Sequence, residues 1–279
     1  MKINQDLAVS TDQILLVPYD AHHVGRYHRW MQDEDLREAT ASDLLTLEEE
    51  YENQQSWRTA HDKLTFIICQ PATTPAVTSP TSSAGIFAGE DDIETRMVGD
   101  VNLFLTRDDD NDDEEEDSIL GNGDTSGFGG IKGEIDIMIA APEHRRKGHG
   151  EAAVRAFLWF LGGNLKSILD EYAVISSSSS SHSHSASPAA GNGAVTKQET
   201  NKVPRGKEKK PILKKLVAKI NAENQGSIRL FENLGFRRDG EVNYFGEVSM
   251  VLVDFLAFGL DGNKDSYREC FYDRSQLKN

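Results

Sequence analysis

The chain has 279 residues with 46 acidic and 30 basic side chains, which gives a formal net charge of −16. A charge of this sign excludes the basic surface that nucleic-acid binding requires, and two cysteines are too few for a disulfide framework. No apolar run approaches the about 18 residues that a membrane span needs, and no secretory leader pattern opens the sequence. We therefore expect a cytoplasmic protein, with the nucleus as the alternative, that binds neither nucleic acid nor membrane; its oligomeric state is left open.

Three segments are too polar or too low in complexity to add to a packed core, because they bury little apolar surface when they become ordered. They are residues 71–96, 107–130 and 176–211, and we expect each to be a disordered insertion. The second contains nine acidic residues between Asp108 and Asp117, which favour a solvated loop over an interaction site. The basic stretch 197–215 favours a flexible tether over a nuclear-import or phosphate-binding patch. The rest of the chain suits one compact α/β domain spanning residues 1–279.

Hydrophobic spacing predicts the elements of the N-terminal part. An apolar run at residues 14–19, ended by Pro18, predicts a strand, and apolar residues at helical spacing over 24–31 predict a helix. A second helix is expected to begin at Thr46, whose hydroxyl can accept from the amide of Glu49 while the Glu49 side chain reaches back. Residues 63–70 predict a further strand.

Two strands are expected on either side of the acidic run, which would then form a β-hairpin connection. The first covers residues 97–105, where Asp100 and Asn102 share one face; plain surface polarity is favoured there over a role in orienting substrate. The second covers residues 134–140 and alternates regularly, so that isoleucines fall on one face and Glu134, Asp136 and Met138 on the other.

The C-terminal part predicts a helix from residue 151 that stops at Gly162 and Gly163, then a strand at 212–220. A helix at 227–234, a short strand at 236–238 and a strand at 247–255 follow. This order of elements indicates an α/β fold with a central mixed sheet and helices on both faces.

The string from Arg145 to Gly150 lies between the predicted strand at 134–140 and the helix that follows it. A helix N-terminus presents unpaired amides and a partial positive charge to an anion, and Gly148 and Gly150 allow a ligand to approach the backbone. Two other phosphate loops do not fit. The P-loop needs Lys and Ser or Thr after its last glycine, and the dinucleotide fingerprint needs Gly-x-Gly-x-x-Gly after a strand.

The same string resembles the Arg-x-x-Gly-x-Gly pyrophosphate motif of the GNAT superfamily, and residues 224–236 resemble that superfamily's later segment of Asn, Ser, an aromatic and Gly-Phe. Further segments outside the insertions are similar to the N-acetyltransferase 9 branch, at residues 17–19, 23–31, 45–48, 65–67 and 98–106. The resemblance implies a GNAT fold and transfer of an acetyl group from acetyl-CoA, the co-substrate, to a primary amine. The acceptor would be a protein or peptide, with tubulin as the candidate because the branch is associated with microtubules.

The resemblance also implies the residues that bind acetyl-CoA. In the GNAT fold the strand at 134–140 splays from its neighbour, and its free backbone amides contact the pantetheine and the thioester. The implied cofactor-binding residues are Met138, Ile139, Ala140, Arg145, Arg146, Lys147, Gly148, His149, Gly150, Asn224 and Phe231.

Catalysis needs a group that takes a proton from the acceptor and a source of a proton for the departing thiolate. Glu134 and Asp136 are the candidate bases, with Glu134 slightly preferred, although a solvent-facing role for both is equally open. Many GNAT enzymes carry tyrosine where this chain has Phe231, so Tyr244 or water would have to supply the thiolate proton. Weak catalysis is the remaining option, and it leaves an acetyl-CoA-binding or microtubule-interacting module as the alternative function.

A metal site is not expected. His182 and His184 lie in a serine-rich segment, where a polar repeat is favoured over metal binding because no second ligand cluster accompanies them.

Overall fold

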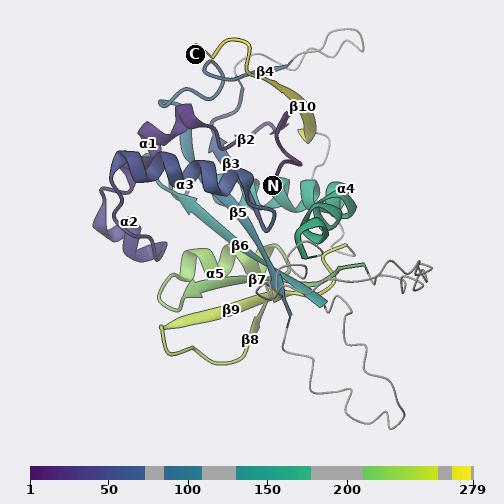
Figure 1. Cartoon of the computed structure of the whole chain (residues 1–279). Coiled ribbons are helices and arrows are strands. Elements are labelled where there is room, and N and C mark those ends of the chain that lie inside the picture. The colour runs from purple at the N-terminus through teal and green to yellow at the C-terminus, as the bar shows by residue number, and fades with distance from the viewer. Residues whose placement is uncertain (73–84, 109–129, 177–209, 257–265, 278–279) are drawn as a thin grey trace, which may run out of the picture.

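The computed structural model describes residues 1–72, 85–108, 130–176, 210–256 and 266–277 (Figure 1). The strands are β1 Leu7–Ser10, β2 Leu15–Pro18, β3 Lys63–Cys69, β4 Ile86–Phe87, β5 Met97–Arg107, β6 Gly130–Ile139, β7 Ile212–Asn221, β8 Arg237–Asp239, β9 Glu247–Leu252 and β10 Arg268–Asp273. The α-helices are α1 Val24–Trp30, α2 Glu34–Ala39, α3 Leu47–Thr59, α4 His149–Ser176 and α5 Gln225–Asn233. Two 3₁₀ turns, Ala21–His23 and Pro142–His144, complete the set in these ranges.

The strands form one sheet in the order β4-β10-β1-β2-β3-β5-β6-β7-β9-β8. β6 runs parallel to β7, and β4 runs parallel to β10, while the other neighbours are antiparallel. Figure 1 shows α1, α2 and α3 on one side of the sheet and α4 on the other. The predicted α/β fold with a mixed sheet and helices on both faces is confirmed.

Each face of the sheet has its own hydrophobic core. On one face Phe66 packs edge-on against Phe157 and Phe160 of α4, with ring centroids 6.0 and 5.1 Å apart. On the other face the side chains of Trp30 and Met31 are buried with Met138. Because successive strand residues point to opposite faces, β6 contributes Ile135 to the first core and Met138 to the second.

β6 and β7 separate partway along their length. The parallel pairing begins at Gly130 and Ile212 and ends at Glu134 and Val217, although β6 continues to Ile139 and β7 to Asn221. Figure 1 shows the two strands diverging beyond that point. The splay leaves the β7-facing edge of residues 135–139 without a strand partner.

The predicted capping box of α3 is confirmed. The Thr46 hydroxyl accepts from the amide of Glu49 at 3.3 Å, and the Glu49 carboxylate accepts from the Thr46 amide at 2.8 Å. These bonds satisfy two of the backbone donors that a helix start leaves open.

The predicted end of the long helix is wrong. α4 continues through Gly162 and Gly163 to Ser176, and neither glycine has the positive φ of a helix-terminating residue. Ile168 and Leu169, one to two turns beyond the glycines, are buried. The continuation is therefore supported by packing, which outweighs the about 1 kcal/mol that each glycine costs a helix interior.

The first predicted insertion is also wrong in part, because residues 85–96 carry β4 and the buried carboxylates Asp91 and Asp92. The rest of that segment, most of the acidic run (residues 109–129) and the serine-rich segment with His182 and His184 (residues 177–209) lie outside the described residues. The acidic run does connect antiparallel neighbours, as expected, since β5 pairs with β6. Four elements, β1, β4, β10 and α2, were not predicted from the sequence.

Candidate acetyl-CoA and acceptor site

The loop from Arg145 to Gly150 joins the splayed end of β6 to the start of α4. Arg145 is turned back on the strand: its Nε donates to the Ile139 carbonyl at 2.9 Å and an Nη donates to the Ala140 carbonyl at 3.0 Å. Arg146 has a φ of 59°, an uncommon left-handed conformation for a residue with a side chain. Arg145 thus holds the loop in shape, whereas the side chains of Arg146 and Lys147 are exposed.

The two glycines of the loop have different environments. Gly148 has a φ of +84°, and a Cβ built on it would meet no atom within 4 Å. At Gly150 a Cβ would lie 3.0 Å from Leu230 Cδ1 and 3.8 Å from Ile139 Cγ1. Gly148 therefore borders open space at the helix start, while Gly150 allows α4 to pack closely against α5 and β6.

The start of α4 offers amide donors beside this open space. His149 opens the helix, and its ring nitrogen Nδ1 lies 3.2 Å from the His144 carbonyl oxygen. The first amides of a helix have no partner within the helix, and they carry a partial positive charge. With Arg146 and Lys147 in solvent beside it, this helix start has the donors and charge that a pyrophosphate needs.

The backbone beyond the splay is only partly free. The amides of Ala140 and Ala141 both donate to the Val98 carbonyl, at 3.0 and 3.3 Å. Ala140 therefore contributes its carbonyl to Arg145 and its amide to β5. The Met138 carbonyl also faces β5, since it lies 1.8 Å from where a Cβ on Gly99 would be, which leaves Ile139 as the residue of this group on the splayed edge.

The later family segment has structural roles. The Asn224 side chain caps α5 by accepting from the Ser227 amide at 3.1 Å. Phe231 is 2% exposed and packs edge-on against Phe236, with centroids 5.0 Å apart. Asn224 therefore stabilises the start of α5, and the buried Phe231 ring packs this helix against the core.

Glu134 and Asp136 share the polar face of β6 but differ in their partners. Glu134 forms an ion pair with Lys219 of β7 at 2.8 Å. Asp136 is exposed, yet the surrounding strands remove part of its water, and together with the charge of Glu134 this raises the pKa of its carboxyl to about 6. Asp136 therefore has the pKa of a proton acceptor that works near neutral pH.

The expectation that Asp100 and Asn102 are surface residues is wrong: they are 2% and 5% exposed. Asp100 accepts from the Tyr27 hydroxyl of α1 at 3.3 Å and from Asn102 Nδ2 at 2.9 Å. Burial, with the charge of Asp136, raises the pKa of Asp100 to about 7, although these two hydrogen bonds oppose the shift. Helices α1 and α3 cover this part of the sheet, and sequence alternation cannot show which face a helix covers.

Asp136 lies close to the buried pair on the same face of the sheet. In the β5–β6 register Asn102 is directly opposite Asp136, and Asp100 is opposite Met138. Residues opposite each other across strands point to the same face, so the three polar side chains form one cluster. The strand register, which only the fold supplies, brings them together.

Tyr244 is not part of this cluster's interior. Its side chain is 97% exposed in the turn between β8 and β9, and its ring contacts that of Phe245 at a centroid distance of 5.6 Å.

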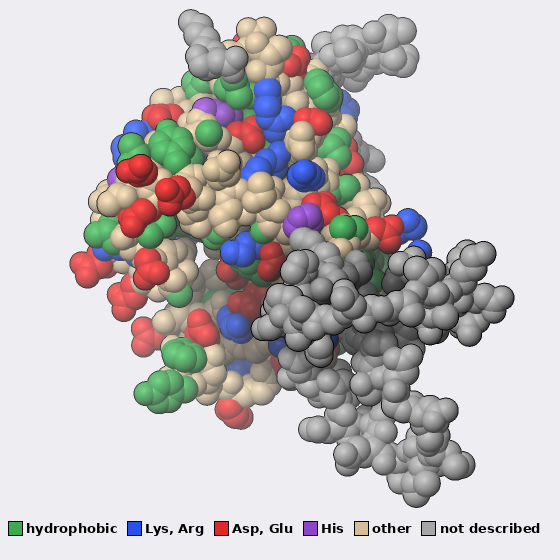
Figure 2. All heavy atoms as spheres, viewed as in Figure 1, with side chains coloured by type: hydrophobic (Ala, Val, Ile, Leu, Met, Phe, Trp, Pro, Cys, Tyr) green, Lys and Arg blue, Asp and Glu red, His purple; other side chains and the backbone are tan. Residues whose placement is uncertain are grey.

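A polar cleft lies between the helical side and the far end of the sheet. Figure 2 shows the molecule hollowed between α2–α3 and the β8–β9 region, with acidic and basic side chains on its floor. A cavity of about 120 Å³ at this floor is lined by Lys132, Glu134, Lys215, Val217, Lys219, Asp239, Ser249 and Val251. An acceptor chain could therefore reach the polar face of β6 from solvent.

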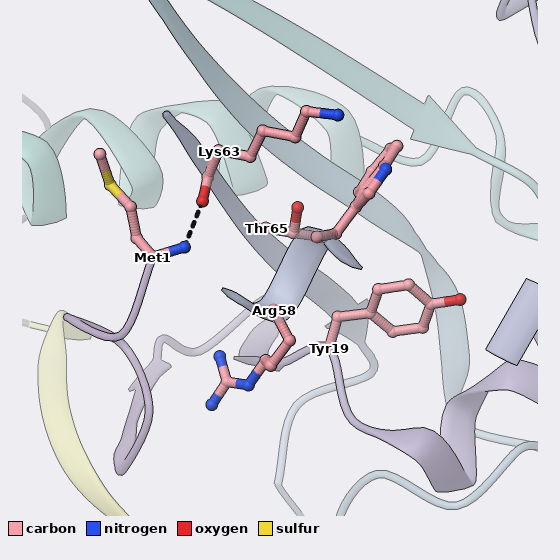
Figure 3. A pocket seen from close by; sticks show the side chains of 6 residues that line it. Met1, Tyr19, Arg58, Lys63 and Thr65 are labelled. Atoms are coloured by element: carbon pink, nitrogen blue, oxygen red, sulfur yellow. Dashed lines mark hydrogen bonds between the residues drawn. The ribbon is translucent and has the colours of Figure 1, made fainter. Parts of the chain in front are cut away.

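A second cavity, beside β3 and α3, is too small for either substrate. Its volume is about 10 Å³, and Tyr19, Arg58, Thr65 and the backbone amine of Met1, which donates to the Lys63 carbonyl, lie around it (Figure 3). This volume accommodates about one water molecule.

One group in the described ranges could suggest a metal site: His22, His23 and Asp92, whose ligand atoms lie within 4.8 Å of one another. His23 Nδ1 accepts from the Asp20 amide at 3.0 Å, which places the proton of a neutral ring on Nε2. That nitrogen lies 3.1 Å from Asp92 Oδ2, so it donates to the carboxylate rather than presenting a lone pair to a cation. The Tyr272 hydroxyl also donates to Asp92. The cluster is best described as a buried hydrogen-bonded carboxylate.

None of the helices in the described ranges combines the length and apolar character needed to cross a membrane.

Comparison with known proteins identifies the family. A family model described as an acetyltransferase (GNAT) domain matches residues 13–237. The Drosophila melanogaster alpha/beta-tubulin-N-acetyltransferase 9 is 37% identical, covering 97% of this chain and 100% of that protein. A Schizosaccharomyces pombe N-acetyltransferase 9-like protein is 33% identical, covering 91% of this chain and 99% of that protein. Among solved structures, a Vibrio cholerae spermidine N-acetyltransferase in complex with CoA and spermine is 12% identical, covers 86% of this chain and 95% of that one, and has a TM-score of 0.46.

The splayed strands, the glycine loop at a helix start and the match to the family model agree. The chain belongs to the GNAT acetyltransferase family, in its N-acetyltransferase 9 branch, and is an acetyl-CoA-dependent N-acetyltransferase.

Proposed function

We propose that the chain transfers the acetyl group of acetyl-CoA to a primary amine of α- or β-tubulin. The observation that carries the proposal is the 37% identity, over 97% of this chain, to a protein named alpha/beta-tubulin-N-acetyltransferase 9. The cleft shown in Figure 2 supports it, because the β6 face that it exposes carries carboxylates suited to a cationic amine. Tubulin as acceptor would place the protein in the cytoplasm.

Acetyl-CoA supplies the activated acetyl carbon. The amides at the start of α4, with Arg146 and Lys147, bind its pyrophosphate, and Gly148 leaves room for it. Ile139 on the splayed edge of β6 orients the thioester.

Asp136 takes the proton that makes the acceptor amine a nucleophile. Transfer forms the bond between nitrogen and the acetyl carbon and breaks the bond between that carbon and sulfur. An acceptor that starts as an ammonium loses two protons. One passes through Asp136 to water, and the other is equivalent to the proton that the departing thiolate gains from water when it becomes a thiol. The carboxylate of Glu134 pairs with Lys219, and its negative charge helps to raise the pKa of Asp136. Water protonates the thiolate, because Phe231 is buried and Tyr244 is almost wholly in solvent.

The test incubates the purified chain with acetyl-CoA and tubulin dimers and locates new acetyl groups by mass spectrometry. Peptides from the tubulin N-termini, lysine-containing tubulin peptides and spermidine serve as competing acceptors. We expect acetyl transfer to tubulin above the small-amine rate. Transfer to spermidine alone, or to no acceptor, would contradict the proposal.

The pyrophosphate assignment is tested by Gly148→Ala. The substitution strains a positive φ and fills open space, so acetyl-CoA affinity measured by calorimetry should fall by about tenfold, or about 1.4 kcal/mol. Gly240→Ala is a matched control, since Gly240 has a φ of +74° and an equally open Cβ direction. Equal loss of affinity in both variants would mean that general strain, rather than the ligand's space, is responsible.

A further inference from the structure

The most unusual polar group in the described part of the chain is the buried carboxylate of Asp100. It accepts hydrogen bonds from the Tyr27 hydroxyl and the Asn102 amide, both neutral, whereas Glu134 on the next strand has a lysine partner. The second oxygen of Asp100 and the carbonyl oxygen of Asn102 are buried without a hydrogen-bond donor in the described structure. Such oxygens are costly in a core unless something supplies a donor or the cost serves function.

The charges around Asp100 are also one-sided. Asp136 faces it from β6, with Glu134 next along that strand, and Glu50 of α3 is buried nearby with the Tyr19 and Tyr27 hydroxyls. Among the groups named here, only Lys219 brings a positive charge, and it is paired with Glu134. In the described structure Lys219, the cation that lowers the pKa of Asp136, is therefore already shared with Glu134.

We infer that Asp100 is a positioning residue for the acceptor: held by Tyr27 and Asn102, it places a second negative charge behind Asp136, which attracts the ammonium form of a primary amine and strengthens Asp136 as proton acceptor. The inference rests on the proposed function and adds the form in which the acceptor is bound. Two like-charged carboxylates on neighbouring strands raise each other's affinity for a proton, so the acid strength of Asp136 depends on the charge state of Asp100.

Burial of a carboxylate that ionises near neutral pH weakens folding. The raised pKa of Asp100 means that the folded state binds its proton more tightly than the unfolded chain does, so stability is lost as pH rises above the unfolded value. Retaining the side chain at this expense is expected of a residue needed for activity. Asp100→Asn should therefore raise the Tm at pH 8 while lowering turnover.

The experiment measures kcat and KM for a tubulin acceptor between pH 5.5 and pH 9 in the full chain, Asp100→Asn and Tyr27→Phe. We expect Asp100→Asn to lower kcat about tenfold near pH 7 and to move the acidic limb to lower pH, because Asp136 becomes a weaker base. Tyr27→Phe should move the same limb to lower pH as well, but by less, because Asp100 loses a bond that favours its ionised form and so places less negative charge beside Asp136. If Asp100 had a purely structural role, its substitution would lower kcat by the same factor at every pH.

Tyr19→Phe is the matched control, since its buried hydroxyl has no hydrogen-bond partner in the described structure. It should leave the pH profile in place. The inference is overturned if Asp100→Asn is fully active, or if both Asp100→Asn and Tyr27→Phe leave the limb unmoved. If the unsubstituted chain forms no product, the proposed function itself fails, and these two failures are thus distinguishable.

Discussion

Gly99 lies where β5 passes the part of β6 that has lost its β7 partner. A Cβ built on Gly99 would lie 1.8 Å from the Met138 carbonyl oxygen, so no side chain fits without moving the backbone. This close approach accompanies the bonds from the Ala140 and Ala141 amides to Val98. A single glycine thus keeps the splayed end of β6 against β5, next to the residue assigned to the thioester.

We expect Gly99→Ala to lower the free energy of unfolding by about 1–3 kcal/mol, because the added methyl group overpacks a strand pair. Urea unfolding measures the change. Gly85→Ala is the control, since its nearest contact would be the Phe271 carbonyl at an ordinary 3.5 Å. A Gly99 variant as stable as the Gly85 variant would show that the two strands can separate freely.

Asp92 is the most heavily bonded buried carboxylate described. Burial alone would raise its pKa, but hydrogen bonds from His22 and His23 and the nearby rings hold the pKa well below its usual value. The Gly89 amide donates to its other oxygen at 2.6 Å. The cluster joins the first 3₁₀ turn, the segment after β4 and Tyr272 of β10, so it ties together parts of the chain that are distant in sequence.

Asp92→Asn should destabilise the fold by about 3–5 kcal/mol at pH 7, since it leaves buried donors facing an amide. A depressed carboxyl pKa contributes stability above the unfolded value of about 3.9 and loses it as pH falls further. The difference between wild type and variant should therefore become smaller by about 1 kcal/mol between pH 5 and pH 3. A difference independent of pH over this range would mean that charge is irrelevant to the cluster.

At the scale of elements, α4 differs most from its sequence-based prediction. Gly162 and Gly163 were expected to end it, yet they lie inside a helix of 28 residues. Local rules treat a glycine pair as a stop, but the helix continues because Ile168 and Leu169 beyond it reach the core. Those contacts are long-range, and local patterns do not contain them.

Gly162→Ala should stabilise the protein by about 0.5–1 kcal/mol, because alanine loses less conformational entropy in a helix and its methyl group meets no atom within 4 Å. Thermal unfolding measures this. Gly235→Ala is the opposing control, because Gly235 has a φ of +86° and does end α5. Loss of stability in the Gly162 variant would indicate that the helix ends there after all.

At the scale of the whole molecule, the sheet joins segments from both ends of the described chain. β1 pairs with β10, so that Leu7 lies opposite Phe271, and β10 in turn pairs with β4. The family match to residues 13–237 stops short of β1 and β10. These strands extend the sheet on the side away from the splay. Each is short and mixes polar with apolar residues, so its sequence has no hydrophobic periodicity from which a strand could be predicted.

Deleting residues 177–187 should leave the fold intact, because the serine-rich sequence has no apolar periodicity. We expect the Tm to change by less than about 2 °C, equivalent to under about 1 kcal/mol at this size. Deleting the equally long stretch 166–176 of α4, which includes the buried Ile168, is the control and should lower the Tm sharply. A similar loss in both would show that the serine-rich segment contributes to stability.

By itself the sequence determined the α/β class, most of the strands, the capped start of α3 and the glycine loop, because each depends on periodicity or on a few neighbouring residues. The family motifs identified acetyl-CoA as co-substrate for the same reason. Only the tertiary structure decided that Asp100 and Asn102 are buried, that Lys219 pairs with Glu134 rather than Asp136, and that Phe231 lies in the core. Burial, register and ion pairing arise from elements distant in sequence, and they are what separates Asp136, as the proposed base, from the carboxylate beside it.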